Sequence, residues 1–112
     1  MTGTANFSSA AMLAMELIPT IRARLEQLEA ERTNRPGRDP LASGHRAALW
    51  RAQQHAARID HTLEDLRRYC LKSLHSWHFL NEQDENDYLL GYRQGFQAVL
   101  KDIRAVESRS VH

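Results

Sequence analysis

The chain has 112 residues, 42% of them hydrophobic and 26% charged, with a formal net charge of +1 at neutral pH. This length predicts a single domain, residues 1–112, with a hydrophobic core, and the composition excludes a disordered chain. The near-neutral charge favours no class of partner, the single cysteine excludes an internal disulfide framework, and no apolar run approaches the roughly 20 residues of a membrane span.

The expected compartment follows from the same features. One cysteine without a partner, Cys70, is typical of a reducing environment. The N-terminal sequence MTGTANFSSAAMLAMELIP contains a short apolar run with no basic residue before it, so it does not resemble a signal peptide. We therefore expect a cytoplasmic protein that does not enter a membrane.

The first predicted helix extends over about residues 8–34. Ser8 or Ser9 is a suitable N-cap, because a hydroxyl can accept a hydrogen bond from the first helical turn. Pro19 lies inside the segment and removes one backbone donor, so we expect a kink or a break near Leu17–Ile18. The buried face of this helix follows 3-4-3 spacing and comprises Ile18, Ile21, Leu25 and Leu28.

The second predicted helix is the longest, at about residues 44–79, and follows a loop at residues 34–44 that contains two prolines and two glycines. Its apolar positions alternate at spacings of three and four for about four heptads, a pattern typical of coiled coils and long bundle helices. Such a helix would span roughly 54 Å. Its seam consists of Leu49, Ala52, Ala56, Ile59, Leu63, Leu66, Cys70, Ser73, Trp77 and Leu80.

The third predicted helix covers about residues 83–107. Asp84 and Asp87 interrupt the preceding seam, so we expect a turn at residues 78–83, with Asn81 as the next N-cap. The apolar face of this helix comprises Leu89, Tyr92, Phe96, Val99, Ile103 and Val106.

Two glycines, Gly91 and Gly95, lie four residues apart in the third predicted helix, where each costs about 1 kcal/mol relative to alanine. At about 100° per residue they lie at one side of the apolar face, beside Tyr88. We interpret them as the place where a second helix packs closely. The alternative is that they only accommodate a bend.

Together these elements predict an all-α fold, an antiparallel bundle of three main helices with the first kinked at Pro19. The central helix is longer than its neighbours can cover, so its apolar overhang favours a homodimer. A monomer in which the kinked first helix covers the whole seam is the alternative. The residues expected in helix packing or in the dimer interface are Leu49, Ala52, Ala56, Ile59, Leu63, Leu66, Tyr88, Gly91, Tyr92, Gly95 and Phe96.

The residue types that carry chemistry do not form a recognisable catalytic pattern. His75 and His78 are one turn apart and Glu82 follows, but zinc needs a further ligand, and the sequence has neither a cysteine pair nor an HExxH motif. Cys70 lies on the seam, and we interpret it as a small buried hydrophobe. We therefore expect no enzyme activity, no metal and no cofactor.

Basic side chains recur on the face of the second predicted helix that lies opposite its seam. A solvated surface explains this pattern most simply, and binding to an acidic protein surface or to nucleic acid are the alternatives. The candidate partner-binding residues on this face are Arg51, Arg58, His61, Arg68 and Lys72.

These patterns favour a non-enzymatic protein–protein interaction module that acts as a helical homodimer. Its expected role is that of an adaptor, a chaperone-like partner or an inhibitor, as found among bacterial and phage accessory factors. The alternative function is a nucleic-acid-binding regulator that uses the basic face of the central helix.

Overall fold

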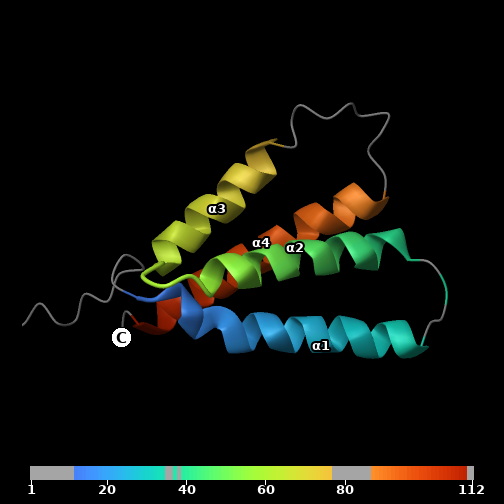
Figure 1. Cartoon of the computed structure of the whole chain (residues 1–112), viewed down its shortest axis with the longest axis horizontal. Coiled ribbons are helices and arrows are strands. Elements are labelled where there is room, and N and C mark those ends of the chain that lie inside the picture. Colours follow the sequence, from blue (N-terminus) through green and yellow to red (C-terminus); the bar gives the residue numbers. More distant parts are fainter. Residues whose placement is uncertain (1–11, 35–36, 38, 77–86, 111–112) are drawn as a thin grey trace, which may run out of the picture.

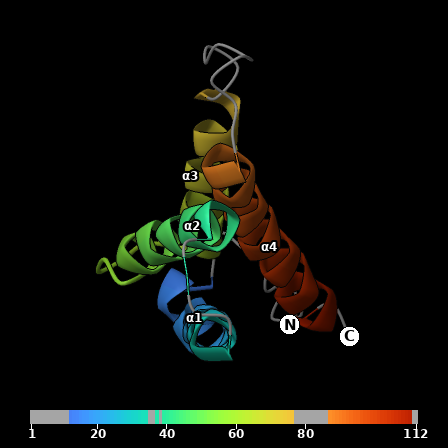
Figure 2. The ribbon, with the colours of Figure 1, turned by 90° about the vertical axis from the view of Figure 1, so that its right-hand side faces the viewer.

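The computed structural model describes residues 12–34, 37, 39–76 and 87–110, and this part of the chain is all-helical (Figure 1). A short 3-10 helix, η2 (Ala14–Leu17), leads into four α-helices, α1 (Ile18–Asn34), α2 (Pro40–Ala56), α3 (Leu63–Ser76) and α4 (Asp87–Ser110). Successive α-helices run in opposite directions, so α2 and α4 run in the same direction (Figure 1). The most extensive contact is between α2 and α4, while α1 packs mainly on α2, and α3 packs on α4 and α2 (Figure 2).

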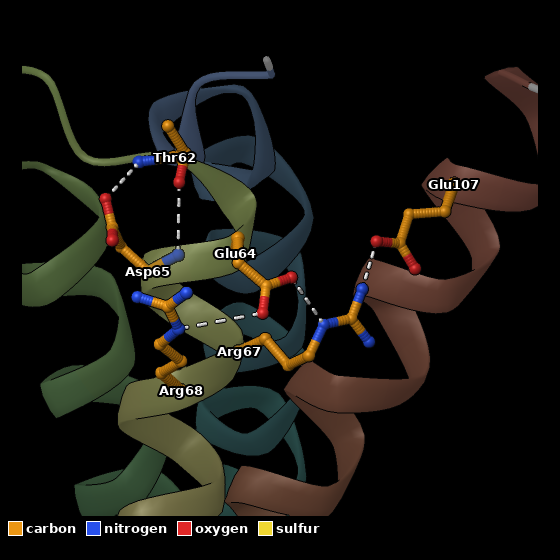
Figure 3. Close-up of polar contacts among 6 residues, drawn as sticks. All are labelled: Thr62, Glu64, Asp65, Arg67, Arg68 and Glu107. Carbon is orange, nitrogen blue, oxygen red and sulfur yellow. Dashed lines mark hydrogen bonds and ion pairs between the residues drawn. The ribbon is translucent and has the colours of Figure 1, made fainter. Parts of the chain in front are cut away.

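The prediction of one long second helix is wrong, because two helices, α2 and α3, occupy that stretch. α2 ends at Ala56, and the chain turns through Asp60, whose φ of 70° lies in the left-handed region. The N–H of Thr62 then donates to Oδ2 of Asp65 at 2.9 Å, and the N–H of Asp65 donates to Oγ1 of Thr62 at 3.1 Å (Figure 3). This reciprocal capping box satisfies two free N–H groups and fixes the start of α3. The described part of the chain therefore contains four α-helices, where three were predicted.

The N-terminal segment packs on the connection between α2 and α3. The N–H of Ala14 donates to the carbonyl oxygen of His61, and the N–H of Leu63 donates to the carbonyl oxygen of Met12, both at 2.8 Å. These two bonds form an isolated antiparallel bridge. They satisfy backbone groups that a continuous helix would have paired internally, which stabilises the break.

The kink expected at Pro19 is not confirmed. Pro19 lies in the first turn of α1, where a helix does not use the backbone N–H that proline lacks. The chain instead changes from 3-10 to α-helical geometry between Leu17 and Ile18. The expected helix start near residue 8 lies outside the described residues.

α2 begins at Pro40, before the predicted start at residue 44. The Asp39 side chain accepts a hydrogen bond from the N–H of Ala42 at 3.2 Å, and a proline follows at the start of the helix. Both features are typical of helix N-termini. The predicted turn at residues 78–83 lies outside the described residues, which resume at Asp87.

The closest contact between α2 and α4 is made by three glycines, Gly44, Gly91 and Gly95. A Cβ atom on Gly44 would lie 1.8 Å from the carbonyl oxygen of Tyr88, and one on Gly91 would lie 1.9 Å from that of Leu41. A Cβ atom on Gly95 would lie 2.6 Å from a side-chain carbon of α2. The two helices therefore touch through their backbones, which a residue with a side chain would prevent.

The hydrophobic core lies along this contact and extends to α1, η2 and α3. Its members are apolar side chains of all five elements, and the largest fully buried ones include Phe96. The core consists of Ala14, Leu17, Ile21, Ala48, Leu49, Ala52, Ala56, Leu63, Leu66, Cys70, Tyr92, Phe96, Val99 and Ile103.

Candidate functional site

Most residues predicted to pack between helices lie in the core of a single chain. Tyr88 and Ile59 are the exceptions, at 40% and 81% exposure. Ile59 is exposed because α2 ends at Ala56, so this position belongs to the connection and not to a helical seam. The buried members of the predicted set are Leu49, Ala52, Ala56, Leu63, Leu66, Gly91, Tyr92, Gly95 and Phe96.

Gly44 was not among the predicted packing residues, although it makes the closest contact of the three glycines. Small residues recur at every fourth position of α2, and residues so spaced lie in one row along a helix. That spacing is the sequence signal that identifies this contact. The buried row consists of Gly44, Ala48, Ala52 and Ala56.

The basic residues predicted to share one face do not form a continuous stripe, because the helix that would carry them is divided. They are distributed over α2, the α2–α3 connection and α3 as Arg51, then Arg58 and His61, then Arg68 and Lys72. The Arg68 guanidinium also lies 3.8 Å from the carboxylate of Glu64, an exposed ion pair (Figure 3). The described residues therefore lack the continuous basic stripe on which the nucleic-acid alternative depended.

The structure brings one of these basic residues, Arg51, onto the aromatic side chains of α4. Its guanidinium carbon lies 5.8 Å from the ring centre of Tyr92, within range of a cation–π contact. The Tyr92 ring is stacked on Tyr88 with their centres 6.3 Å apart. We call these three residues, Arg51, Tyr88 and Tyr92, the α2–α4 aromatic face.

A partly buried ion pair joins α1 to α4 on another side of the bundle. Arg24 donates from Nε and Nη2 to the two carboxylate oxygens of Asp102, at 2.6 and 2.7 Å. Asp102 is 9% exposed, and these hydrogen bonds raise the pKa of Arg24. This bidentate geometry is the strongest kind of ion pair in proteins. No local sequence pattern predicts this contact, because 78 positions separate the two residues.

A second ion-pair network attaches α3 to the C-terminal half of α4. Arg67 donates to Glu64 at 3.2 Å and also to Glu107 of α4 (Figure 3). The two carboxylates raise the pKa of the Arg67 guanidinium, Glu107 most strongly. Together with the capping box of Thr62, this network fixes the direction in which α3 leaves the connection.

Two histidines meet at the α2–α3 connection. Nδ1 of His55, in the last turn of α2, lies 3.2 Å from Nδ1 of His61. The His55 ring is also stacked on Tyr69 of α3, with ring centres 4.2 Å apart and planes inclined by 18°. The sequence placed His61 on the outer face of the second predicted helix, so this pair was not predicted. It arises because the chain reverses between α2 and α3.

The surroundings of this histidine pair favour an uncharged His55. Burial is the main cause of a lowered pKa for His55, and the charges of His61 and Arg58 add to it. The Asp65 carboxylate opposes this shift, and it stays charged because its hydrogen bonds to Thr62 lower the pKa of Asp65. The neutral imidazole therefore keeps a lone pair available near neutral pH.

Two adjacent hollows of about 380 Å³ each lie where α1 meets the N-terminal half of α2. Glu31 and Asp39 line both of them, Arg46 lines one, and Arg24 and His45 line the other. Burial, followed by the charge of Arg24, lowers the pKa of His45. Acidic and basic groups are mixed along both hollows, so neither hollow favours an anion over a cation.

Within the described residues no group of three or more His, Cys, Asp or Glu side chains is arranged to hold a metal ion. Cys70 is buried between helices, and burial raises the pKa of its thiol to about 12. A thiol with that pKa is almost entirely protonated at neutral pH and is a poor nucleophile. Of the pair His75 and His78, His78 lies outside the described residues.

No described helix is long and apolar enough to cross a membrane. Comparison of the chain with protein-family models, curated proteins and solved structures gives no match. The function is therefore inferred from the chain's own residues and their arrangement.

Proposed function

We propose that this chain is a non-enzymatic protein-binding module that associates with a second copy of itself and acts as an adaptor, a chaperone-like partner or an inhibitor. Its small size and helical composition are common among bacterial and phage accessory factors, and we propose a cytoplasmic role of that kind. Such a role needs a shaped surface rather than a catalytic centre.

The observation that carries this proposal is the α2–α4 aromatic face. Tryptophan, tyrosine and arginine are the residue types most enriched among those that contribute most to protein–protein binding. Tyr88 is 40% exposed, and the Arg51 guanidinium lies over the ring of Tyr92, on which Tyr88 is stacked. Because the glycine contact holds α2 against α4, the face is ordered before a partner binds, which lowers the entropy lost on binding.

A second copy of the chain suits this face because the face contains both members of a cation–π pair. In a two-fold symmetric dimer the same patch of each copy meets itself, so a residue on one copy contacts a different residue on the other. Arg51 of one copy would then lie on Tyr88 of the other copy, and the reverse contact would form as well.

The nucleic-acid alternative has less support. It depended on a straight basic helix of about 36 residues, and the basic residues belong to two helices and a connection. Arg51, the first of them, lies over Tyr92. A regulator of this kind would have to bind through separate basic patches.

Sedimentation equilibrium of the full chain tests the proposed self-association. We expect Tyr88→Ser and Arg51→Ser each to weaken the dimer by about tenfold or more, which corresponds to about 1.4 kcal/mol. Leu90→Ser is the matched control: Leu90 is 43% exposed on the same helix but lies about 160° around it from Tyr88. Equal weakening by all three changes would contradict the proposal, and so would no weakening by any of them.

A further inference from the structure

The histidine pair at the α2–α3 connection has the geometry of two metal ligands. The two Nδ1 atoms of His55 and His61 are 3.2 Å apart, with ring centres 4.4 Å apart and planes inclined by 54°. Zinc binds imidazole nitrogen at about 2.0–2.1 Å, so two nitrogens at adjacent corners of a zinc tetrahedron are about 3.3 Å apart. We propose that His55 and His61 form a two-histidine site for a divalent transition metal ion, Zn²⁺ or Cu²⁺. This inference does not depend on the proposed dimer.

Both histidines are held in place by contacts that a metal ion would not disturb. His55 lies in the last turn of α2, and its ring is stacked on Tyr69. The carbonyl oxygen of His61 accepts the N–H of Ala14 at 2.8 Å, and the next residue, Thr62, starts the capping box of α3. Little conformational freedom is left to lose on binding, so the site is preorganised.

The charges around the pair decide the pH range in which a metal ion can bind. Arg58 lies in the connection and disfavours a cation, whereas the carboxylate of Asp65 at the start of α3 favours one. A metal ion requires both imidazoles to be neutral, and burial already favours the neutral form of His55. The same separation of 3.2 Å suits an N–H···N hydrogen bond, so the donor imidazole would carry its proton on Nε2 instead of Nδ1 when both Nδ1 atoms bind an ion. Protonation of either imidazole would remove the lone pair that binds the ion, so metal binding should weaken at acidic pH.

The number of ligands sets the expected strength and selectivity. No third His, Cys, Asp or Glu side chain completes the site within the described residues, so water would fill the remaining positions. A site of two imidazoles should follow the Irving–Williams order and bind Cu²⁺ more tightly than Zn²⁺. Ca²⁺ and Mg²⁺, which prefer oxygen ligands, should not bind to it.

Isothermal titration calorimetry of the full chain, freed of metal with a chelator, tests this site with ZnCl₂ and with CuCl₂. We expect one ion per chain and a loss of affinity of about tenfold or more in His55→Gln and in His61→Gln. His75→Gln is the control, because it removes an exposed histidine of α3 that the HSWH sequence offers as a competing ligand. Failure of both ions to bind the wild type would overturn the proposal. Loss of binding only in His75→Gln would do so too.

A second measurement covers the case in which a histidine variant does not fold. In the wild-type chain, NMR spectra of ¹⁵N-labelled imidazoles report which nitrogen binds an ion. Addition of Zn²⁺ should shift the Nδ1 signals of His55 and His61 and leave the other histidines unchanged. Shifts confined to other histidines would overturn the proposal.

Discussion

Replacing Gly91 by alanine should destabilise the protein, although alanine is the better helix former. The added Cβ atom would lie 1.9 Å from the carbonyl oxygen of Leu41, and ordinary contact begins at 3.4 Å. Because the obstacle is backbone and not a mobile side chain, α4 would have to move by about 1.5 Å from α2. That movement opens the core around Ala48 and Phe96.

Two opposing contributions determine how much the substitution changes the free energy of unfolding. Overpacking of a well-packed interface costs about 1–3 kcal/mol. Because the added Cβ would clash with backbone atoms, we expect the cost to be about 3 kcal/mol or more. The better helix propensity of alanine returns about 1 kcal/mol. We therefore expect Gly91→Ala and Gly44→Ala each to lower the free energy of unfolding by about 2 kcal/mol or more. Gly95→Ala should have a smaller effect, since its Cβ would meet its nearest atom at 2.6 Å.

Urea unfolding followed by circular dichroism measures these changes. Ala105→Gly, at an exposed position of the same helix, is the control that measures helix propensity alone and should cost about 1 kcal/mol. If the contact between α2 and α4 were loose, only helix propensity would act, and Gly91→Ala would stabilise the protein by about 1 kcal/mol. That result would refute the close backbone contact.

Three further predictions concern the polar contacts. Asp102→Ala should lower stability by about 2 kcal/mol in urea unfolding, because it leaves the partly exposed Arg24 without its buried carboxylate. Thr62→Ala should cost about 1 kcal/mol by removing one half of the capping box, and amide hydrogen exchange should increase first at the start of α3. Stability should fall as the pH drops from about 7 to 5.5, because the pKa of His55 is lower in the folded chain and the unfolded chain binds the proton more readily. His55→Gln should reduce this dependence, and His45, with a pKa shifted in the same direction, should account for part of the remainder.

The sequence was sufficient to predict an all-helical fold and most of the buried positions, because helical periodicity is a local property. The prediction from the heptad pattern is wrong at one place. Its 3-4 spacing continues through Ile59, yet the chain turns there, since capping by Thr62 and pairing with the N-terminal segment outweigh continuation of the helix. The sequence Thr-Leu-Glu-Asp is a capping-box signal that could have indicated the break.

The candidate site was less predictable, because its residues come from different helices. Arg51 and Tyr88 were assigned to different surfaces, and only the crossing of α2 and α4 brings them together. The pairing of His55 with His61 likewise requires the reversal between α2 and α3. Periodicity identifies the face of a helix on which a residue lies, but not which other helix that face meets.

The central claim, that the chain binds a second copy through the α2–α4 aromatic face, is tested most directly by its mass in solution. Light scattering across a concentration series should give twice the chain mass of 12.9 kDa for the wild type at high concentration. Under the same conditions Arg51→Ser/Tyr88→Ser should stay at the monomer mass with its circular dichroism spectrum unchanged. A wild-type chain that remains monomeric at every concentration would contradict the claim.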